Sequence, residues 1–275
     1  MIKKEIDISV VMAVYKNDTA LFFSDAIISL LNQTYLPSEI VIVIDGFVNQ
    51  EIEDVLQKYC NNDLFKIIRL PKNKGLANAL NVGIISAKHG LIARMDADDI
   101  CFPDRFEKQV NYLRKENLDF VGGQMIEFGK DISDIISERK VPYKHEDIIK
   151  FMKYRAPFSH PTILFKKSVF DSLNGYDVNI FPEDYDFFVR VYLNDFKMGN
   201  VKDNVLWFRL GENLSEALRR RWGKAYAKNE YKLYKKYLKL GFYNRIDFLK
   251  AVMFKIPLRI LPFPIFKFIY YKISR

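Results

Sequence analysis

The first hundred residues alternate between short apolar runs and longer segments with helical periodicity. The apolar runs cover residues 8–14, 40–44, 65–70 and 91–95. The first is continuous and contains β-branched residues, which is typical of a strand buried on both faces of a sheet. The segments with helical spacing cover residues 25–32, 52–59 and 75–87. This alternation predicts an α/β fold with a mostly parallel central sheet flanked by helices.

The second part of the chain has a more mixed pattern. The spacing predicts an amphipathic helix over 105–114 and a strand over 120–126. An acidic segment, 182–186, opens a further helix that continues to residue 193. A helix rich in Lys and Tyr is expected over 225–240.

Three carboxylates stand close together at the end of the fourth predicted strand: Asp96, Asp98 and Asp99. Carboxylates at this spacing repel one another, which raises their pKa values. A hard cation such as Mg²⁺ takes oxygen ligands and keeps substrate phosphates in its shell, so it would neutralise them. The cluster therefore indicates a metal-dependent site for a nucleotide-linked substrate. The alternative is a solvated turn, with Asp104 as the N-cap of the next helix.

Polar residues also follow the neighbouring strands. Tyr15 comes directly after the first strand and Asp45 after the second. Ligands of parallel α/β sheets bind at the carboxyl ends of the strands, so Tyr15, Asp45 and residues 96–99 are expected at one edge. The chain has neither a P-loop nor a Gly-rich dinucleotide loop, which argues against an ordinary ATPase or dehydrogenase.

The net charge of +9 is unevenly distributed. Residues 219–275 hold 16 Lys and Arg against two acids, whereas residues 1–218 hold 27 Lys and Arg against 32 acids. Such a basic tail indicates an anionic partner. Apolar and aromatic residues with only cations between them favour an anionic membrane surface over nucleic acid. Packing of the tail on the main domain is the structural alternative.

Prolines bear on how this tail would meet a membrane. Pro257, Pro262 and Pro264 are expected to interrupt any long helix. No run of 18 or more uncharged apolar residues is present, so no spanning helix is predicted. The tail is therefore expected to lie on a membrane surface.

Several segments, in their order and spacing, resemble family 2 glycosyltransferases, and especially the bacterial enzymes that build exopolysaccharide and O-antigen repeat units. The similar segments are 10–17, 29–35, 39–46, 73–83, 93–99, 103–106, 160–162, 175–176 and 183–186. The resemblance covers residues 6–225 and implies a GT-A (Rossmann-like) fold.

The resemblance also implies a division of the chain. Residues 1–218 would form the glycosyltransferase domain, with a nucleotide-sugar half (1–100) and an acceptor half (101–218). Beyond most of the region that the resemblance covers, the charge and the apolar pattern of residues 219–275 predict a basic, amphipathic, aromatic-rich helical tail that associates with a membrane.

The resemblance implies site residues at matching positions. Those expected to bind the nucleotide sugar are Ala13, Tyr15, Asp45, Lys74, Asp96 and Ala97. Asp98 would bind Mn²⁺ or Mg²⁺, and Asp184 would be the general base. Those expected to bind the acceptor or a diphosphate are Glu183, His160, Arg220 and Arg221. For the arginines, a solvated helix start is the alternative. The family often has two acids where this chain has Ile44 and Asp45, so recognition of the base, expected to be uracil, would depend on Asp45 alone.

The function implied is an inverting transfer of one hexosyl or N-acetylhexosaminyl unit from a UDP-sugar. The acceptor would be a lipid-diphosphate-linked (undecaprenyl-type) saccharide, during surface polysaccharide assembly. The protein would be peripheral, on the cytoplasmic face of the inner (plasma) membrane. The alternatives are a transferase acting on lipid A core or another glycolipid, and a non-catalytic sugar-nucleotide-binding scaffold. The presence of Asp96, Asp98 and Asp184 argues against the scaffold.

Overall fold

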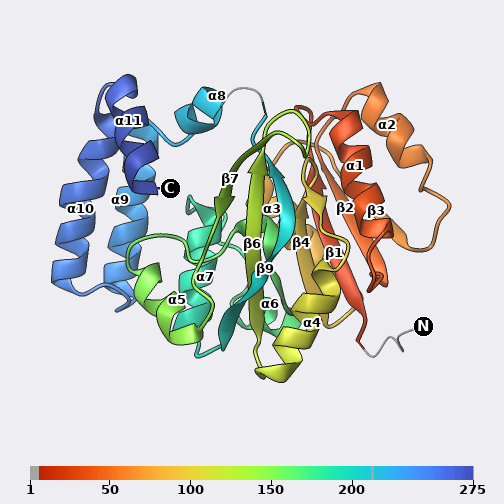
Figure 1. The fold of residues 1–275 in the computed structure, drawn as a ribbon, viewed down its shortest axis with the longest axis horizontal. Helices are drawn as coiled ribbons and strands as arrows, with labels where there is room; N and C mark the ends of the chain where they lie inside the picture. Colours follow the sequence, from red (N-terminus) through yellow and green to blue (C-terminus); the bar gives the residue numbers. More distant parts are fainter. Residues whose placement is uncertain (1–5, 212–213, 275) are drawn as a thin grey trace.

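The computed structural model describes residues 6–211 and 214–274, which fold around one central sheet (Figure 1). Within these residues the sheet has nine strands in the order β3-β2-β1-β4-β8-β6-β9-β5, and β7 pairs with β6. The strands are β1 (Ile8–Val14), β2 (Glu39–Asp45), β3 (Phe65–Leu70), β4 (Leu91–Asp96), β5 (Ile100–Cys101), β6 (Phe120–Phe128), β7 (Ile135–Arg139), β8 (Leu164–Lys166) and β9 (Met198–Arg209).

Helices flank both faces of the sheet. Those of the main body are α1 (Ala20–Leu31), α2 (Gln50–Gln57), α3 (Leu76–Ser86), α4 (Arg105–Lys115), α5 (His145–Met152), α6 (Lys167–Ser172) and α7 (Glu183–Leu193). Those that follow β9 are α8 (Leu214–Arg219), α9 (Lys224–Lys239), α10 (Arg245–Ile260) and α11 (Phe263–Ser274). The expected α/β fold with flanking helices is confirmed.

The burial and parallel pairing of the N-terminal strands explain why the sequence pattern predicted them correctly. Strands β1 to β4 are parallel neighbours, and β1 and β2 are almost fully buried. Alternate residues of β1 face opposite cores, because side chains alternate along a strand. Met12 packs in the core that includes residues of α1, α2 and α4, whereas Val11 packs with residues of α3 and α7.

Two features of the body differ from the sequence pattern. Helix α1 begins at Ala20, five residues before the predicted start, because its first turns bury Phe23 as well as Ala26. The twelve-residue strand β9 was missed because Lys202, Asp203 and Asn204 interrupt its apolar pattern. Pairing with β6 along most of its length holds it in the sheet, which is mixed beyond β4.

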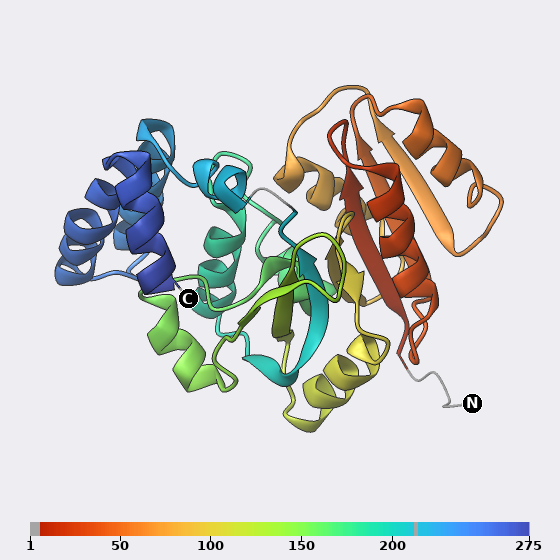
Figure 2. The same ribbon diagram turned by 45° about the horizontal axis from the view of Figure 1, so that its top comes forward.

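The tail helices lie together at one end of the molecule, away from β3 (Figures 1 and 2). Helix α9 packs on the main body, with Tyr237 meeting Tyr185 of α7 at a ring-centroid distance of 5.5 Å. The Lys236 ammonium lies 2.8 Å from Asp177 and 2.7 Å from the fully buried Asp186. The structural alternative for the tail therefore holds for α9.

The prolines affect the tail helices less than expected. Pro262 lies in the break between α10 and α11, and Pro264 lies in the first turn of α11. Pro257 lies inside α10, so that part of the expectation was wrong. Pro257 and Met253 are both on the exposed face, where water can solvate a carbonyl that the missing N–H leaves free. In the described part of the chain, no helix combines the length and apolarity needed to span a membrane.

Candidate active site

The carboxyl ends of β1, β2 and β4 bring the predicted polar residues to one edge of the sheet. Ala13 stands opposite Asp96 in the β1–β4 register, and Val14 stands opposite Ile44 in the β1–β2 register. Tyr15, Asp45 and the acidic segment 96–99 therefore follow neighbouring strands at the same level. The expected convergence is confirmed.

Asp45 fixes the loop that precedes α3. Its carboxylate is 4% exposed and accepts hydrogen bonds from the backbone N–H groups of Lys74 (2.7 Å) and Gly75 (2.8 Å). Gly46 has φ +89°, and a Cβ there would lie 2.6 Å from the backbone nitrogen of Asn73. The Lys74 side chain is exposed. Contact of Asp45 with a base stays a prediction, and its role in the fold is to hold this loop.

Asp96, Asp98 and Asp99 form the acidic cluster of the site. Each offers one carboxylate oxygen within 4.8 Å of the others, and no other cluster of this kind occurs among the described residues. Asp99 is fully buried and accepts a hydrogen bond from the backbone N–H of Arg209 at 2.9 Å. Its Oδ2 is buried without a hydrogen-bond partner in the described structure. Three clustered carboxylates, one of them with a buried oxygen that has no hydrogen-bond partner in the described structure, fit a divalent cation.

The Arg94 guanidinium holds Asp96 in a fork. The two hydrogen bonds measure 2.7 and 2.5 Å, and the Arg94 side chain is 2% exposed. Because Arg94 engages both oxygens of Asp96, Asp98 is the member of the cluster with the freer carboxylate. This geometry suits the predicted division between a nucleotide contact at Asp96 and a metal ligand at Asp98.

Burial and mutual repulsion perturb the acids of this edge. Burial, reinforced by the charge of Asp96, raises the pKa of Asp98 to about 6. Burial, followed by repulsion from Asp98 and Asp96, raises the pKa of Asp99 well above its usual range. Asp18, in the turn after β1, has its pKa raised to about 7, chiefly by burial. Asp18 was not among the predicted site residues, although it follows Tyr15 by only three residues.

These shifts predict how pH affects the metal-free protein. The folded state binds protons at Asp18 and Asp98 more tightly than the unfolded chain, so their contribution to stability is lost as pH rises towards 7. In EDTA, the melting temperature should fall between pH 5 and pH 8, by roughly 2–4 °C for each kcal/mol lost. Mn²⁺ should restore more stability at pH 7.5 than at pH 5, because protons compete with the metal. A melting temperature that rises with pH in EDTA would contradict this arrangement.

Arg209, at the end of β9, ties the acidic segment to the sheet. Its Nε donates to the Asp98 carbonyl at 2.9 Å, in addition to the backbone bond to Asp99. The guanidinium lies 3.9 Å from the ring centroid of Phe22 and 4.6 Å from that of Phe128. Arg209 was not among the predicted site residues, because β9 itself was not predicted and no local pattern links this arginine to the acids.

The start of α7 supplies the second pair of carboxylates. Burial, followed by repulsion from Asp184, raises the pKa of Glu183 to about 7. Arg94 and Asp96 also influence this pKa, in opposite directions, so the start of α7 lies near the acidic cluster. Asp184 Oδ1 accepts a hydrogen bond from the Tyr185 N–H at 2.8 Å, which orients that carboxylate.

His160 is buried, whereas Arg220 and Arg221 of the tail are both exposed. The Nε2 of His160 lies 2.9 Å from Tyr176 Oη. Burial, with the nearby Arg94 charge, holds the pKa of His160 well below its usual range, so the ring is neutral. Arg221 donates to Tyr270 Oη at 2.8 Å, and Arg220 is exposed. Acceptor contacts by these three residues stay predictions.

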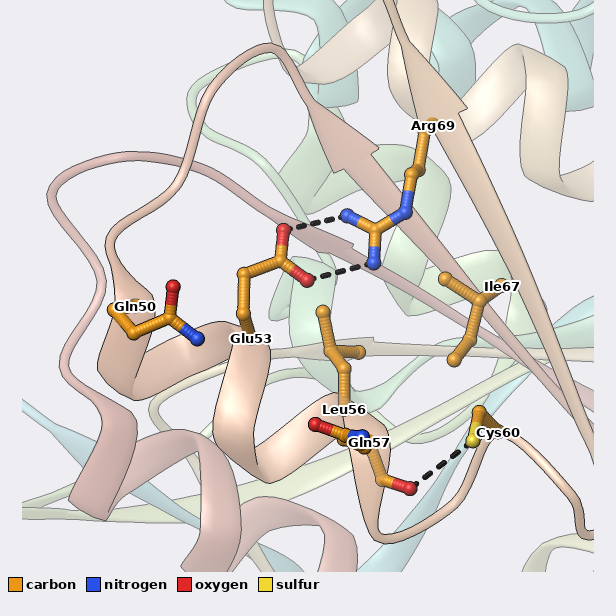
Figure 3. Close-up of a pocket in the computed structure, with 7 residues that line it drawn as sticks. All are labelled: Gln50, Glu53, Leu56, Gln57, Cys60, Ile67 and Arg69. Atoms are coloured by element: carbon orange, nitrogen blue, oxygen red, sulfur yellow. Dashed lines mark hydrogen bonds and ion pairs between the residues drawn. The ribbon is translucent and has the colours of Figure 1, made fainter.

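A separate surface hollow lies between α2 and β3 (Figure 3). Glu53 and Arg69 form a bidentate pair across it, with bonds of 2.6 and 2.7 Å. None of the predicted site residues lines this hollow. Its charged groups already neutralise each other, so it is not part of the site.

Comparison with known proteins assigns the chain to a family. Residues 9–173 match the model of Glycosyl transferase family 2. The chain belongs to this family of glycosyltransferases.

Two relatives are similar to the chain over nearly its whole length. The amylovoran biosynthesis glycosyltransferase AmsE of Erwinia amylovora is 31% identical, over 96% of this chain and 98% of its own. The UDP-Gal:alpha-D-GlcNAc-diphosphoundecaprenol beta-1,3-galactosyltransferase of Escherichia coli is also 31% identical, over 97% of this chain and 96% of its own.

Solved structures share the fold. TarS 1–349 of S. aureus, in complex with UDP-GlcNAc, matches 90% of this chain and 72% of its own with a TM-score of 0.67 and 16% identity. The mannosyltransferase PcManGT of Pyrobaculum calidifontis, in complex with GDP-Man and Mn²⁺, matches 99% and 76% with a TM-score of 0.67 and 14% identity. The GT-A fold expected from the sequence is thereby confirmed.

Proposed function

We propose that this protein is an inverting glycosyltransferase that moves one hexosyl or N-acetylhexosaminyl unit from a UDP-sugar to a lipid-diphosphate-linked saccharide. The reaction would belong to surface polysaccharide biosynthesis. The observation that carries the proposal is the acidic cluster, bound to Arg94 through Asp96, with Glu183 close enough for the charges of Arg94 and Asp96 to affect its pKa and with Asp184 next to it in the chain. The donor and acceptor named for the E. coli relative support the choice of substrates.

On the donor side, the chain's own residues hold the nucleotide end of the substrate. Mn²⁺ or Mg²⁺ bound at Asp98 would neutralise the charge that develops on the departing diphosphate. Arg94 keeps the Asp96 carboxylate in place through its fork. Ala13 and Tyr15 lie at the end of β1 beside this cluster, and Asp45 holds the neighbouring loop. These residues form the proposed UDP-sugar pocket.

On the acceptor side, Asp184 takes the proton of the attacking hydroxyl. A hydroxyl is a weak nucleophile, so proton removal accompanies its attack on the anomeric carbon. The new bond to the acceptor oxygen forms as the bond to the diphosphate oxygen breaks on the opposite face, which inverts the anomeric centre. Glu183, which lies beside Asp184, would hydrogen-bond the acceptor sugar.

We further propose that one face of α10 binds an anionic membrane surface. The exposed apolar side chains on α10 are Ile246 (64%), Leu249 (57%), Met253 (59%), Phe254 (73%) and Ile260 (55%). Exposed cations, Arg245 and Lys250, accompany them. Apolar side chains with flanking cations suit an interfacial helix.

Both acids of the tail are engaged elsewhere, which leaves this face without negative charge. Glu230 is buried and accepts two hydrogen bonds of 2.9 Å from Arg259. Asp247 completes the capping box of α10 and lies 3.3 Å from the Lys153 ammonium. Repulsion from anionic lipid is therefore minimal.

Charge placed on this face should release the protein from lipid. Replacing Met253 and Phe254 together by Glu should weaken sedimentation with phosphatidylglycerol vesicles by about tenfold or more, since burying each side chain is worth roughly 1.5–3 kcal/mol. The matched control replaces Leu36 and Ile85, which are 51% and 67% exposed elsewhere on the surface, by Glu. Equal sedimentation of both variants would contradict the membrane face.

Calorimetric titration tests the function itself. The purified protein is titrated with a panel of UDP-sugars in Mn²⁺ and again in EDTA. Binding of one UDP-sugar only in the presence of metal is the expected result. Binding restricted to GDP- or dTDP-sugars would overturn the UDP assignment. A folded protein that binds no sugar nucleotide would overturn the proposed function as a whole.

A further inference from the structure

Three arginines from separate elements lie close enough for their charges to interact where the tail joins the main body. Arg139 ends β7, Arg155 follows α5, and Arg221 follows α8. The tail helices lie on the side of the body that carries α5 and α7 (Figures 1 and 2). Burial, and then repulsion from Arg221 and Arg155, lowers the pKa of Arg139. Positive charge from three parts of the chain is therefore concentrated at this junction, which we term the arginine junction.

The arginine junction has polar groups that the fold leaves unused. Arg139 Nε is buried without a hydrogen-bond partner in the described structure. Arg221 is bonded to a phenol, Tyr270, instead of a carboxylate. Arg259, in contrast, has a bidentate partner in Glu230. A buried donor without a partner costs free energy, so an anion that supplies acceptor oxygens would stabilise the junction.

Tyr270 of α11 reports the strength of the local positive field. Burial alone would raise the pKa of its phenol, but Arg221, Arg139 and Arg259 lower it below its usual range. The charge of Asp184 also acts on Arg221, so the arginine junction borders the proposed catalytic carboxylate. The arginine junction therefore lies on the acceptor side of the site, because the site carboxylate whose charge affects the pKa of Arg221 is that of Asp184.

We propose that Arg139, Arg155 and Arg221 bind the diphosphate of the lipid-linked acceptor and so place its sugar at Asp184. This inference rests on the proposed function. Guanidinium groups bind phosphate oxygens bidentately, and two adjacent phosphates offer enough oxygens for several arginines. Helix α11 contributes Tyr270 to the junction and the 48% exposed Ile265 to the surface of the tail. The diphosphate and the lipid chain would thus meet neighbouring parts of one helix.

The test is calorimetric titration of the full chain, in EDTA, with inorganic pyrophosphate and with farnesyl diphosphate. Arg139→Gln and Arg221→Gln should each weaken binding of both probes by about ten- to a hundredfold, as loss of a charged hydrogen bond predicts. Arg221→Lys should lose part of the affinity, because an ammonium cannot bind bidentately. Lys232→Gln, an exposed change of equal charge on α9, should alter affinity less than about twofold.

Two further arms identify the source of the diphosphate. Asp98→Asn should leave pyrophosphate binding in EDTA unchanged, and the arginine variants should still bind the UDP-sugar in Mn²⁺. Loss of UDP-sugar binding in the arginine variants would assign the junction to the donor and overturn the proposal. Affinities of the arginine variants equal to that of Lys232→Gln would also overturn it.

Folding and the proposed function can be judged separately from this result. Arg139→Gln should not lower the melting temperature, because it removes one of several like charges. Pyrophosphate should raise the melting temperature of the unaltered protein and not that of Arg139→Gln. If the protein bound diphosphate through these arginines but no sugar nucleotide, the junction would stand and the proposed function would fail.

Discussion

Asp184→Asn is expected to lower kcat by about 10²- to 10⁴-fold, the usual contribution of a positioned general base. The amide keeps the shape of the side chain and its oxygen can still accept the Tyr185 N–H, so α7 should begin at the same residue. It cannot take a proton from the acceptor hydroxyl. Affinity for the UDP-sugar should change little, since Asp184 acts on the acceptor side. Turnover measured by UDP release, together with donor calorimetry, checks both expectations.

Glu183→Gln is the matched comparison, because Glu183 stands next to Asp184 and has its pKa raised to about 7. We expect a higher KM for the acceptor and a smaller loss of kcat. A larger loss of kcat in Glu183→Gln than in Asp184→Asn would exchange the two roles. Asp184→Asn should also lower the pKa of Glu183, because the repulsion that raises it is removed. The pH dependence of residual activity would reveal that change.

Asp98→Asn is expected to have two effects of opposite sign. Metal-dependent binding of the UDP-sugar should weaken by about a hundredfold or more, because a carboxylate ligand of the cation is lost. In EDTA at pH 7.5 the same variant should melt at a higher temperature than the unaltered protein. The cause is that burial and Asp96 oppose ionisation of Asp98, whose pKa of about 6 lies below that pH.

The pH dependence and a control variant separate the effect of Asp98→Asn on the melting temperature from a general effect of removing a carboxylate. At pH 5 the Asp98 carboxyl is largely protonated, so the gain in melting temperature should shrink. Asp63→Asn makes the same chemical change at an exposed position before β3 and should alter neither property. If Asp98→Asn bound the donor and the metal normally, Asp98 would not be a ligand of the metal.

The local sequence pattern was sufficient to predict the elements whose structure depends mainly on residues adjacent in the chain. Strands β1 and β3 occupy the predicted residues, because the apolar pattern of a short strand is a local property of the sequence. The carboxyl ends of parallel strands meet by geometry, so the placing of Asp45 and Asp98 at one edge also followed from the sequence. The resemblance to a family supplied roles that periodicity could not.

The tertiary structure decided what depends on segments far apart in the chain. The hydrogen bond from the Arg209 N–H to Asp99 joins residues 110 positions apart, and no local sequence pattern predicts it. The same holds for the packing of Tyr237 on Tyr185 and for the approach of Arg139 to Arg221. The sequence by itself determined strands β1 to β4 and β6, the acidic cluster and the basic tail. Only the fold decided which charges are buried, because burial and long-range approach arise from packing of the whole chain.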